Sequence, residues 1–302
     1  MRFQFKTAGI AALLLLSAHL ALACDLCSYS VGLNPNFNQN QVGLRYRYRN
    51  FIGQHSHNDG HSHVHSPDRE SFETFELWGR WCPSPKWRIQ AILPYARNTA
   101  YSQDSILDQM HGLGDASVMA LFQLLQKGDM DDDGLRQRLF AGLGGMAPTG
   151  KAKPEAGSAY DAMRQPGSGA WGLMPALSYL LRKGNWGLGA DYNLRLTTTN
   201  YRDYRFSTRH NLNANLFYQL KKKEFSLLPF VGGYAEHARA DQWMRLRQAD
   251  TGGFATFGNA GFEAYWGGFS GTLMVQIPVV QVLNGNQGKN APRITTGLYY
   301  SF

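Results

Sequence analysis

The sequence predicts an all-β fold, an antiparallel up-and-down β-barrel of about 12 strands that crosses a membrane. Three observations lead to this prediction. First, the last ten residues alternate between two kinds of side chain. Second, the chain contains about twelve segments of similar length, of which these residues are the last. Third, the connections between the segments alternate between short and long. A period of two is the pattern of a β-strand with two different faces.

The C-terminal segment shows this alternation most clearly. Its apolar and aromatic side chains share one face with one threonine: Ile294, Thr296, Leu298, Tyr300 and Phe302. A final strand that ends on phenylalanine resembles the closing segment of a bacterial outer-membrane barrel, where it serves as the assembly signal. We therefore expect the C-terminal strand to pair so that the sheet closes, and to be recognised by the barrel-assembly machinery.

The N-terminus has the organisation of a signal peptide. Arg2 and Lys6 precede the apolar run 10–16, and Ala21-Leu22-Ala23 forms a small-x-small cleavage site. We assign residues 1–23 to the signal peptide, 24–41 to a periplasmic segment that is a candidate plug, and 42–302 to the barrel. Cys24 raises the alternative of a lipoprotein, but Ala21 stands where a lipoprotein signal normally has leucine.

Composition agrees with a barrel and argues against nucleic-acid binding. Beyond the signal peptide, no apolar stretch approaches the roughly 20 residues that a membrane helix needs. Aromatic residues reach 13% and charged residues only 17%, with 33 glycines. The formal charge of +8 becomes +6 once Arg2 and Lys6 are removed. Since an exported chain rarely meets nucleic acid, we expect this charge to contact outer-membrane lipids and lipopolysaccharide phosphates.

The strands and their connections can be placed along the chain. Each candidate strand is close to the length of about 9–11 residues that crosses a bilayer at a tilt. The candidate strands are residues 42–50, 71–81, 87–98, 114–125, 136–147, 170–181, 186–197, 208–220, 226–235, 254–265, 269–278 and 293–302. The short connections are 82–86, 126–135, 182–185, 221–225 and 266–268; the long ones are 51–70, 99–113, 148–169, 198–207, 236–253 and 279–292. Outer-membrane barrels have this asymmetry, with short periplasmic turns and longer extracellular loops.

Polar side chains predict which face of each strand is inside. Arg45, Arg47 and Arg49 alternate with apolar and aromatic residues. An arginine on the lipid face costs about 2–4 kcal/mol near the midplane, so we expect all three to face a wet interior with a cationic bias. The same argument predicts further interior residues: Asp191, Asn193, Arg195, Asn211, Asn213 and Asn215. The sequence does not choose between an interior filled by side chains, a plugged one and a narrow pore.

Three cysteines remain after export, and all are expected on the periplasmic side. Cys24 and Cys27 precede the first strand, and Cys82 lies in the first short turn. An oxidising periplasm permits a disulfide from Cys24 or Cys27 to Cys82, which leaves one thiol over. The alternative, a redox or metal pair at Cys24-x-x-Cys27, lacks a thioredoxin-like βαβ unit around it. Both interpretations stay open at this point.

A histidine-rich stretch in the first long connection is the strongest candidate for metal binding. Five histidines fall within eleven residues: His55, His57, His61, His63 and His65. Neutral imidazole is a good ligand for Zn, Cu and Ni, and a flexible His-rich tract binds such ions without a preformed cage. A catalytic zinc site is not expected, because it needs three rigidly held ligands and an open position. The alternative is a solvated loop of low complexity.

Three motifs that suggest other functions fail on inspection. The stretch 129–134 opens like a calcium-binding EF-hand loop, but Phe140 stands where that loop needs glutamate. The stretch 145–151 resembles a nucleotide P-loop but is followed by Ala152 instead of Ser or Thr. No histidine has a serine two residues later, the pair used by barrel phospholipases and deacylases. We therefore expect neither an enzyme nor a required cofactor.

Three glycine- and proline-containing segments carry a family resemblance. They are Gly112-Leu113-Gly114-Asp115, Pro148-Thr149-Gly150, and Gln165-Pro166-Gly167-Ser168-Gly169. In order and placement they resemble the phenol-degradation meta-pathway-type outer-membrane proteins, a family of transporters, over residues 85–302. The resemblance implies a barrel associated with the passage of small compounds. It supplies no substrate-binding residues.

Two functions are compatible with these observations. The first is a monomeric outer-membrane channel or transporter for a small solute, whose loop at 55–65 captures or senses a transition-metal ion at the cell surface. The arginines at 45–49 and at 195 would then favour anions or anionic complexes in the interior. The second is a closed barrel that acts as a surface metal-binding or structural module without transport.

Overall fold

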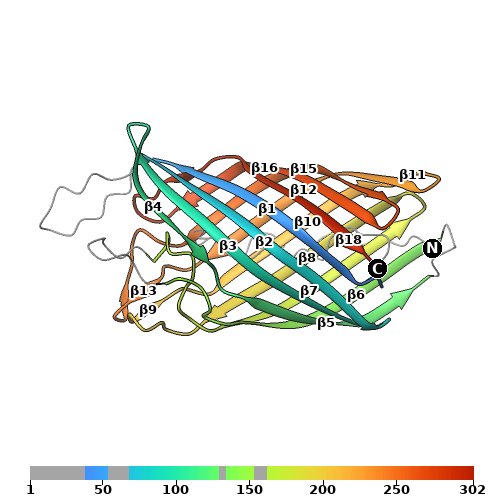
Figure 1. Ribbon diagram of the computed structural model, residues 1–302, viewed down its shortest axis with the longest axis horizontal. Helices are drawn as coiled ribbons and strands as arrows, with labels where there is room; N and C mark the ends of the chain where they lie inside the picture. The colour runs from blue at the N-terminus through green and yellow to red at the C-terminus, as the bar shows by residue number, and fades with distance from the viewer. Residues whose placement is uncertain (1–37, 54–67, 129–133, 153–161) are drawn as a thin grey trace, which may run out of the picture.

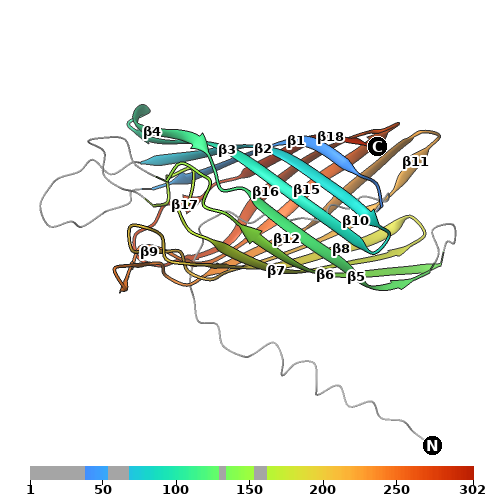
Figure 2. The ribbon, with the colours of Figure 1, turned by 60° about the horizontal axis from the view of Figure 1, so that its bottom comes forward.

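The computed structural model describes residues 38–53, 68–128, 134–152 and 162–302. Twelve of its strands form one barrel, which Figures 1 and 2 show from the side with its long axis horizontal. They are β1 (Gln41–Ile52), β2 (Arg69–Ser84), β3 (Trp87–Ser102), β5 (Ser117–Lys127), β6 (Leu135–Met146), β7 (Gly172–Lys183), β8 (Trp186–Thr197), β10 (Arg209–Tyr218), β12 (Phe225–Ala238), β15 (Gly253–Trp266), β16 (Phe269–Leu283) and β18 (Arg293–Ser301). In the part of the chain that the structure describes, no helix has the length and apolarity to span a membrane.

The twelve strands close into a ring. Each pairs antiparallel with its neighbours in the chain, and β10 pairs with both β8 and β12. The ring is completed by β1 and β18, whose register runs from Gln41 opposite Ser301 to Tyr48 opposite Ile294. Closure leaves no free sheet edge. A free edge inside a membrane would leave backbone N–H and C=O groups without hydrogen-bond partners. The prediction of an antiparallel up-and-down barrel of about 12 strands is confirmed.

The predicted alternation of short and long connections is present, with one correction. Residues 99–113 were expected to form a loop, but β3 continues to Ser102 and β4 (Ser105–Leu113) pairs back onto it. Gln103 and Asp104, with φ of 49° and 63°, form the tight turn. The sequence does not reveal this hairpin because the residues of β4, Ser105–Leu113, do not alternate regularly between apolar and polar side chains. We call the end with the short turns the turn end and the opposite one the loop end.

The two faces of the strands differ in exposure as the alternation predicts. Outward-facing Leu44 and Leu298 are 66% and 54% exposed, whereas inward-facing Arg47 is 6% exposed. Outward-facing aromatic side chains also form a belt at the turn end. Neighbouring rings in this belt have their centroids 4.9–5.1 Å apart in the pairs Trp87–Phe122, Trp186–Tyr218 and Phe269–Tyr300. Such a belt is typical of the interface between a barrel and the lipid headgroups.

Shorter strands lie at both ends of the barrel. β17 (Lys289–Asn290) extends the pairing of β1, and β11 (Leu220–Lys222) extends that of β12. A separate three-stranded sheet joins β9 (Tyr204–Arg205), β13 (Gln242–Trp243) and β14 (Leu246–Arg247). This small sheet connects two long loops that the sequence treats as independent.

Candidate functional site: the barrel interior and the loop-end clusters

A charged sector lies on the inner face of β1 and β2. The alternation that places Arg45, Arg47 and Arg49 on one face of β1 points all three inward, and they are at most 9% exposed. Glu76 on β2 lies opposite Arg45 in the register and is 2% exposed. Its two carboxylate oxygens lie 2.5 Å from Arg45 Nε and from Arg47 Nη2. One buried carboxylate therefore holds two neighbouring guanidinium groups in place.

A second ion pair bridges strands that are not neighbours. Arg293 on β18 reaches past β16 and β15 to Glu236 on β12. Its Nη1 and Nη2 lie 3.1 and 2.7 Å from the two oxygens of Glu236, a bidentate arrangement. The guanidinium carbon of Arg293 also lies 3.9 Å from the centre of the Phe257 ring. This pair is buried near the loop end and links distant parts of the wall.

An amide sector covers the inner face from β8 to β16. Asn211 Nδ2 donates to Asn193 Oδ1 at 2.9 Å. Asn259 Nδ2 donates to Asn213 Oδ1 at 2.8 Å and to Asn215 Oδ1 at 3.1 Å. The inward-facing amides thus satisfy one another in a ladder along the wall, as buried polar groups require.

The remaining predicted interior residues of β8 lie on the same inner face. Ser178 Oγ donates to Asp191 Oδ1 at 2.6 Å across β7 and β8. Arg195 is 1% exposed, nearer the loop end, opposite Arg209 in the register. The structure therefore gathers the predicted polar residues of β8 and β10 in one sector and places those of β1 in another.

A third sector, on β2 to β7, contains an apolar cluster among buried polar side chains such as Arg80, Gln90 and Arg138, and we call it the apolar sector after that cluster. The buried residues of the cluster are Trp78, Ile92, Met119, Leu121, Phe140, Met146 and Met174. Arg88 at the turn end is completely buried, and its guanidinium carbon lies 3.9 Å from the centre of the Phe140 ring. The expectation of a polar interior is thus wrong for this cluster. Sequence reasoning missed it because residues 118–122 are apolar on both faces, so no alternation marks the inner one.

The remaining predicted site residues lie at the edge of the described residues or outside them. His55, His57, His61, His63 and His65 fall outside the described residues, as do Cys24 and Cys27. Cys82 is half-buried and forms no disulfide with another described residue, and its Sγ lies 3.5 Å from the backbone oxygen of Gln39. The metal site and the disulfide pairing stay predictions. Elsewhere, the described residues contain no group of three or more His, Cys, Asp or Glu that would hold a metal ion.

The three segments that carry the family resemblance meet at the loop end in what we call the Asp115 cluster. Asp115 Oδ1 accepts a hydrogen bond from Gly150 N at 3.0 Å. Its Oδ2 accepts from Ser168 N at 2.7 Å and from Ser168 Oγ at 2.5 Å. A Cβ on Gly150 would come within 2.6 Å of the Gly167 Cα, so this approach requires glycine. One buried carboxylate thus joins segments separated by 35 and 53 residues.

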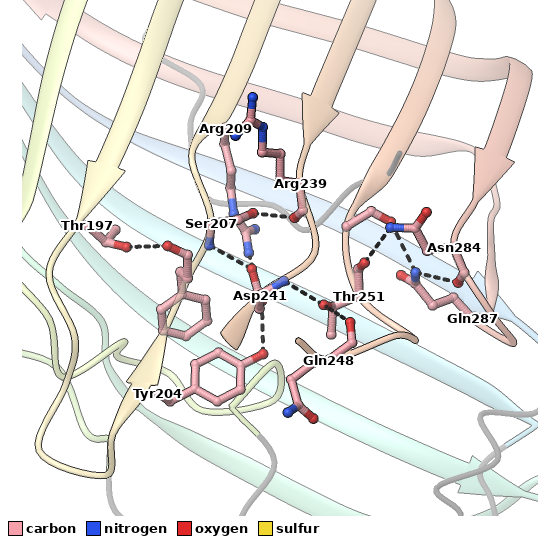
Figure 3. A network of polar contacts seen from close by, with 12 residues as sticks. Thr197, Tyr204, Ser207, Arg209, Arg239, Asp241, Gln248, Thr251, Asn284 and Gln287 are labelled. Atoms are coloured by element: carbon pink, nitrogen blue, oxygen red, sulfur yellow. Dashed lines mark hydrogen bonds and ion pairs between the residues drawn. The ribbon is translucent and has the colours of Figure 1, made fainter. Parts of the chain in front are cut away.

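A neighbouring carboxylate organises the next loops in what we call the Asp241 cluster (Figure 3). Asp241, which is completely buried, accepts hydrogen bonds from Tyr204 OH at 2.9 Å and from Ser207 N at 2.7 Å. Arg209 Nη2 lies 3.5 Å from the same carboxylate. The Asp241 N–H donates to Thr251 Oγ1 at 2.8 Å. This carboxylate therefore ties the small sheet and its loops to the top of β10.

Asn200 links the two clusters. Its Nδ2 donates to the backbone oxygen of Ser168 at 3.0 Å, and its Oδ1 accepts from Tyr204 N at 3.0 Å. The described parts of three long loops are therefore joined in one hydrogen-bonded network. Sequence reasoning did not find this network, because its members contact one another only after the barrel has closed.

Comparison with solved structures places the fold. The chain is similar to the COG4313 outer membrane channel from Pseudomonas putida F1, with a TM-score of 0.70, 14% identity, and 92% of this chain and all of that chain covered. The chain described here therefore has the fold of a bacterial outer-membrane β-barrel. The barrel is also similar, at lower TM-scores, to the beta domain of the Bordetella autotransporter BrkA (0.48, 13% identity, 88% and 100% covered) and to the NanC porin (0.46, 12% identity, 86% and 100% covered). No family model and no curated protein sequence matches the barrel.

Proposed function

We propose that this barrel is an outer-membrane channel that passes small solutes through its interior and favours anions or anionic complexes. The observation that carries the proposal is the charge of the inner wall. Nine buried arginines lie on the described barrel strands, against four buried glutamates, an excess of five positive charges. A pore lined by one sign of charge concentrates ions of the opposite sign.

The arrangement of this charge supports a selective role beyond mere structural pairing. Arg45, Arg47 and Glu76 lie near the middle of their strands and carry two positive charges against one negative. Arg88 adds a positive charge nearer the turn end, where it is buried against Phe140 and acts on the interior through its field. A solute that crosses the barrel would therefore experience a positive potential at more than one depth, with amides on the other side of the wall.

Two further observations support a channel of this kind. The fold is that of a bacterial outer-membrane channel. In addition, the three segments that resemble the phenol-degradation meta-pathway-type family form one hydrogen-bonded cluster around Asp115. They behave as a single structural unit, as segments kept together within a family would. We propose on this basis that the barrel is related to that family.

Purified barrel in planar bilayers and in liposomes tests the channel. We expect discrete conductance steps and liposome swelling with small solutes. Correct folding is first established by heat-modifiable migration on a gel. A folded barrel that neither conducts nor supports swelling would contradict the proposal and would leave a closed barrel as the function.

We also propose that the loop at residues 55–65 binds a transition-metal ion, with Zn, Cu and Ni as the candidate ions. Five histidines at short spacing support it, since neutral imidazole is their common ligand. Calorimetry with Ni²⁺ on the intact barrel and on a barrel lacking residues 54–66 tests it. Equal Ni²⁺ binding by both proteins would contradict the proposal, and a conductance test on the same pair shows whether the loop acts on transport.

A further inference from the structure

Two histidines stand side by side on the outer wall near the loop end. His210 on β10 lies directly opposite His237 on β12 in the register, and their ring centroids are 5.5 Å apart. Both side chains are half-buried, and both alternate with inward-facing residues, Asn211 and Glu236. Tyr192 on β8 holds the first ring, with its hydroxyl 2.8 Å from His210 Nδ1. The three side chains form a polar patch on the face that meets lipid.

A positive charge completes this patch. Arg239 follows β12 directly and is exposed. It follows His237 by two residues, so the alternation of the strand places both side chains on the outward face. Its backbone oxygen is fixed by a hydrogen bond from Ser207 Oγ, and Figure 3 shows its side chain directed away from Asp241. We call His210, His237, Arg239 and Tyr192 the wall patch.

The wall patch differs from other charged positions on the outer wall because no carboxylate on the described residues of the surrounding strands faces it. On the opposite part of the barrel, Arg97 lies 2.5 Å from Glu73, and Arg69 lies 4.0 Å from Asp104. By contrast, among the described residues of β8, β10, β12 and β15, none of the outward-facing side chains near the loop end is a carboxylate. The charge of the wall patch is therefore available to a ligand from outside the chain.

Its position on the barrel limits what that ligand is. The loop end of an outer-membrane barrel faces the cell surface, so the wall around it contacts the outer leaflet. A cationic side chain on the lipid face costs about 2–4 kcal/mol at the midplane but only about 0–1 kcal/mol near the interface. Anionic headgroups at that depth turn this small cost into an attraction.

We propose that the wall patch binds a phosphate group of lipid A, the membrane anchor of lipopolysaccharide. Arg239 supplies a planar guanidinium that matches phosphate geometry. His210 and His237 donate ring N–H groups, and Tyr192 fixes the orientation of the His210 ring. A metal ion is a poorer occupant, because the patch offers two imidazoles and the charge of Arg239 repels a cation. This site lies outside the channel interior, so a test of lipid binding is independent of a test of transport.

Binding of lipid A by the folded barrel in detergent tests the proposal. We compare diphosphoryl lipid A with lipid A from which the phosphates have been removed. The variant H210Q/H237Q/R239Q should lose at least about tenfold in affinity for diphosphoryl lipid A, which corresponds to about 1.4 kcal/mol. The dephosphorylated lipid should bind the parent and the variant equally.

A matched control removes three positive charges from the turn end with K86Q/K183Q/K222Q. Its affinity should stay within about twofold of the parent, since screening limits charge effects to about 10 Å. Equal affinity of the wall-patch variant and the parent would overturn the proposal, as would equal binding of the two lipids by the parent. The single variant R239Q, which changes only an exposed side chain, repeats the test if the triple variant fails to fold. Zn²⁺ bound by the parent and lost in H210Q/H237Q, with lipid binding unchanged, would assign the pair to metal instead.

Discussion

Replacing Asp115 by alanine should open the loop end without unfolding the barrel. The carboxylate accepts three hydrogen bonds, from Gly150 N, Ser168 N and Ser168 Oγ. Asp115 is 3% exposed and Ser168 2% exposed, so water does not simply replace the lost acceptor. A buried donor left without a partner costs about 1–3 kcal/mol. Two backbone donors and one hydroxyl therefore give a local destabilisation of about 3–9 kcal/mol.

Hydrogen exchange measures this destabilisation where it arises. Because about 1.4 kcal/mol is a tenfold change in an equilibrium, the protection of the Gly150 and Ser168 amides should fall by at least about a hundredfold. Amides in the middle of β8 and β10 should keep their protection, since the cluster lies above the strands. Ser168→Ala is the matched control. It removes the hydroxyl bonds to Asp115 and Ala170 and leaves both backbone bonds to Asp115, so it should cost about 1–3 kcal/mol.

Unchanged exchange at Gly150 and Ser168 in the Asp115→Ala barrel would refute the reasoning. It would mean that the loops are held by packing alone and that the three segments do not depend on the carboxylate. Loss of amide protection throughout the barrel would also contradict the prediction, because it would mean that the Asp115 cluster unfolds together with the whole barrel.

Three further changes test other parts of the account. Arg293→Gln leaves Glu236 buried without its ion pair, which costs about 3–5 kcal/mol. The urea concentration at the midpoint for loss of heat-modifiable migration should therefore fall. The double variant R293Q/E236Q should recover most of the lost stability. Glu76→Gln removes the counter-charge of two buried arginines, so the reversal potential under a salt gradient should shift toward that of anions, and a shift toward cations would count against the assigned role. Deleting residues 54–66 should abolish Ni²⁺ binding measured by calorimetry and leave conductance unchanged; a barrel that still binds Ni²⁺ would exclude the loop as the site.

The strands could be predicted where the lipid face and the interior face carry different chemistry. In β8, Trp186, Leu188 and Tyr192 face lipid while Asp191 and Asn193 face inward, and this contrast marks both the strand and its faces. The same contrast in β1 and β18 fixes where the barrel closes. This pattern is visible in the sequence because a polar group that faces lipid is costly, so lipid-facing positions carry apolar side chains.

The rest could not be predicted, because it depends on contacts between distant segments. The apolar sector has no contrast between its faces, so Met119 and Leu121 gave no sign of pointing inward. The Asp115 cluster joins residues that are far apart in the sequence. His210 and His237 form a pair only through the register of β10 and β12, which no local pattern specifies.

Passage of small anions through the interior of this barrel is best measured as the reversal potential of single channels under a KCl gradient. We expect a reversal potential displaced toward the equilibrium potential of chloride, because the inner wall carries nine buried arginines against four buried glutamates on its described strands. A reversal potential displaced toward that of potassium would exclude anion selectivity, and the absence of any current through folded, membrane-inserted protein would exclude a channel.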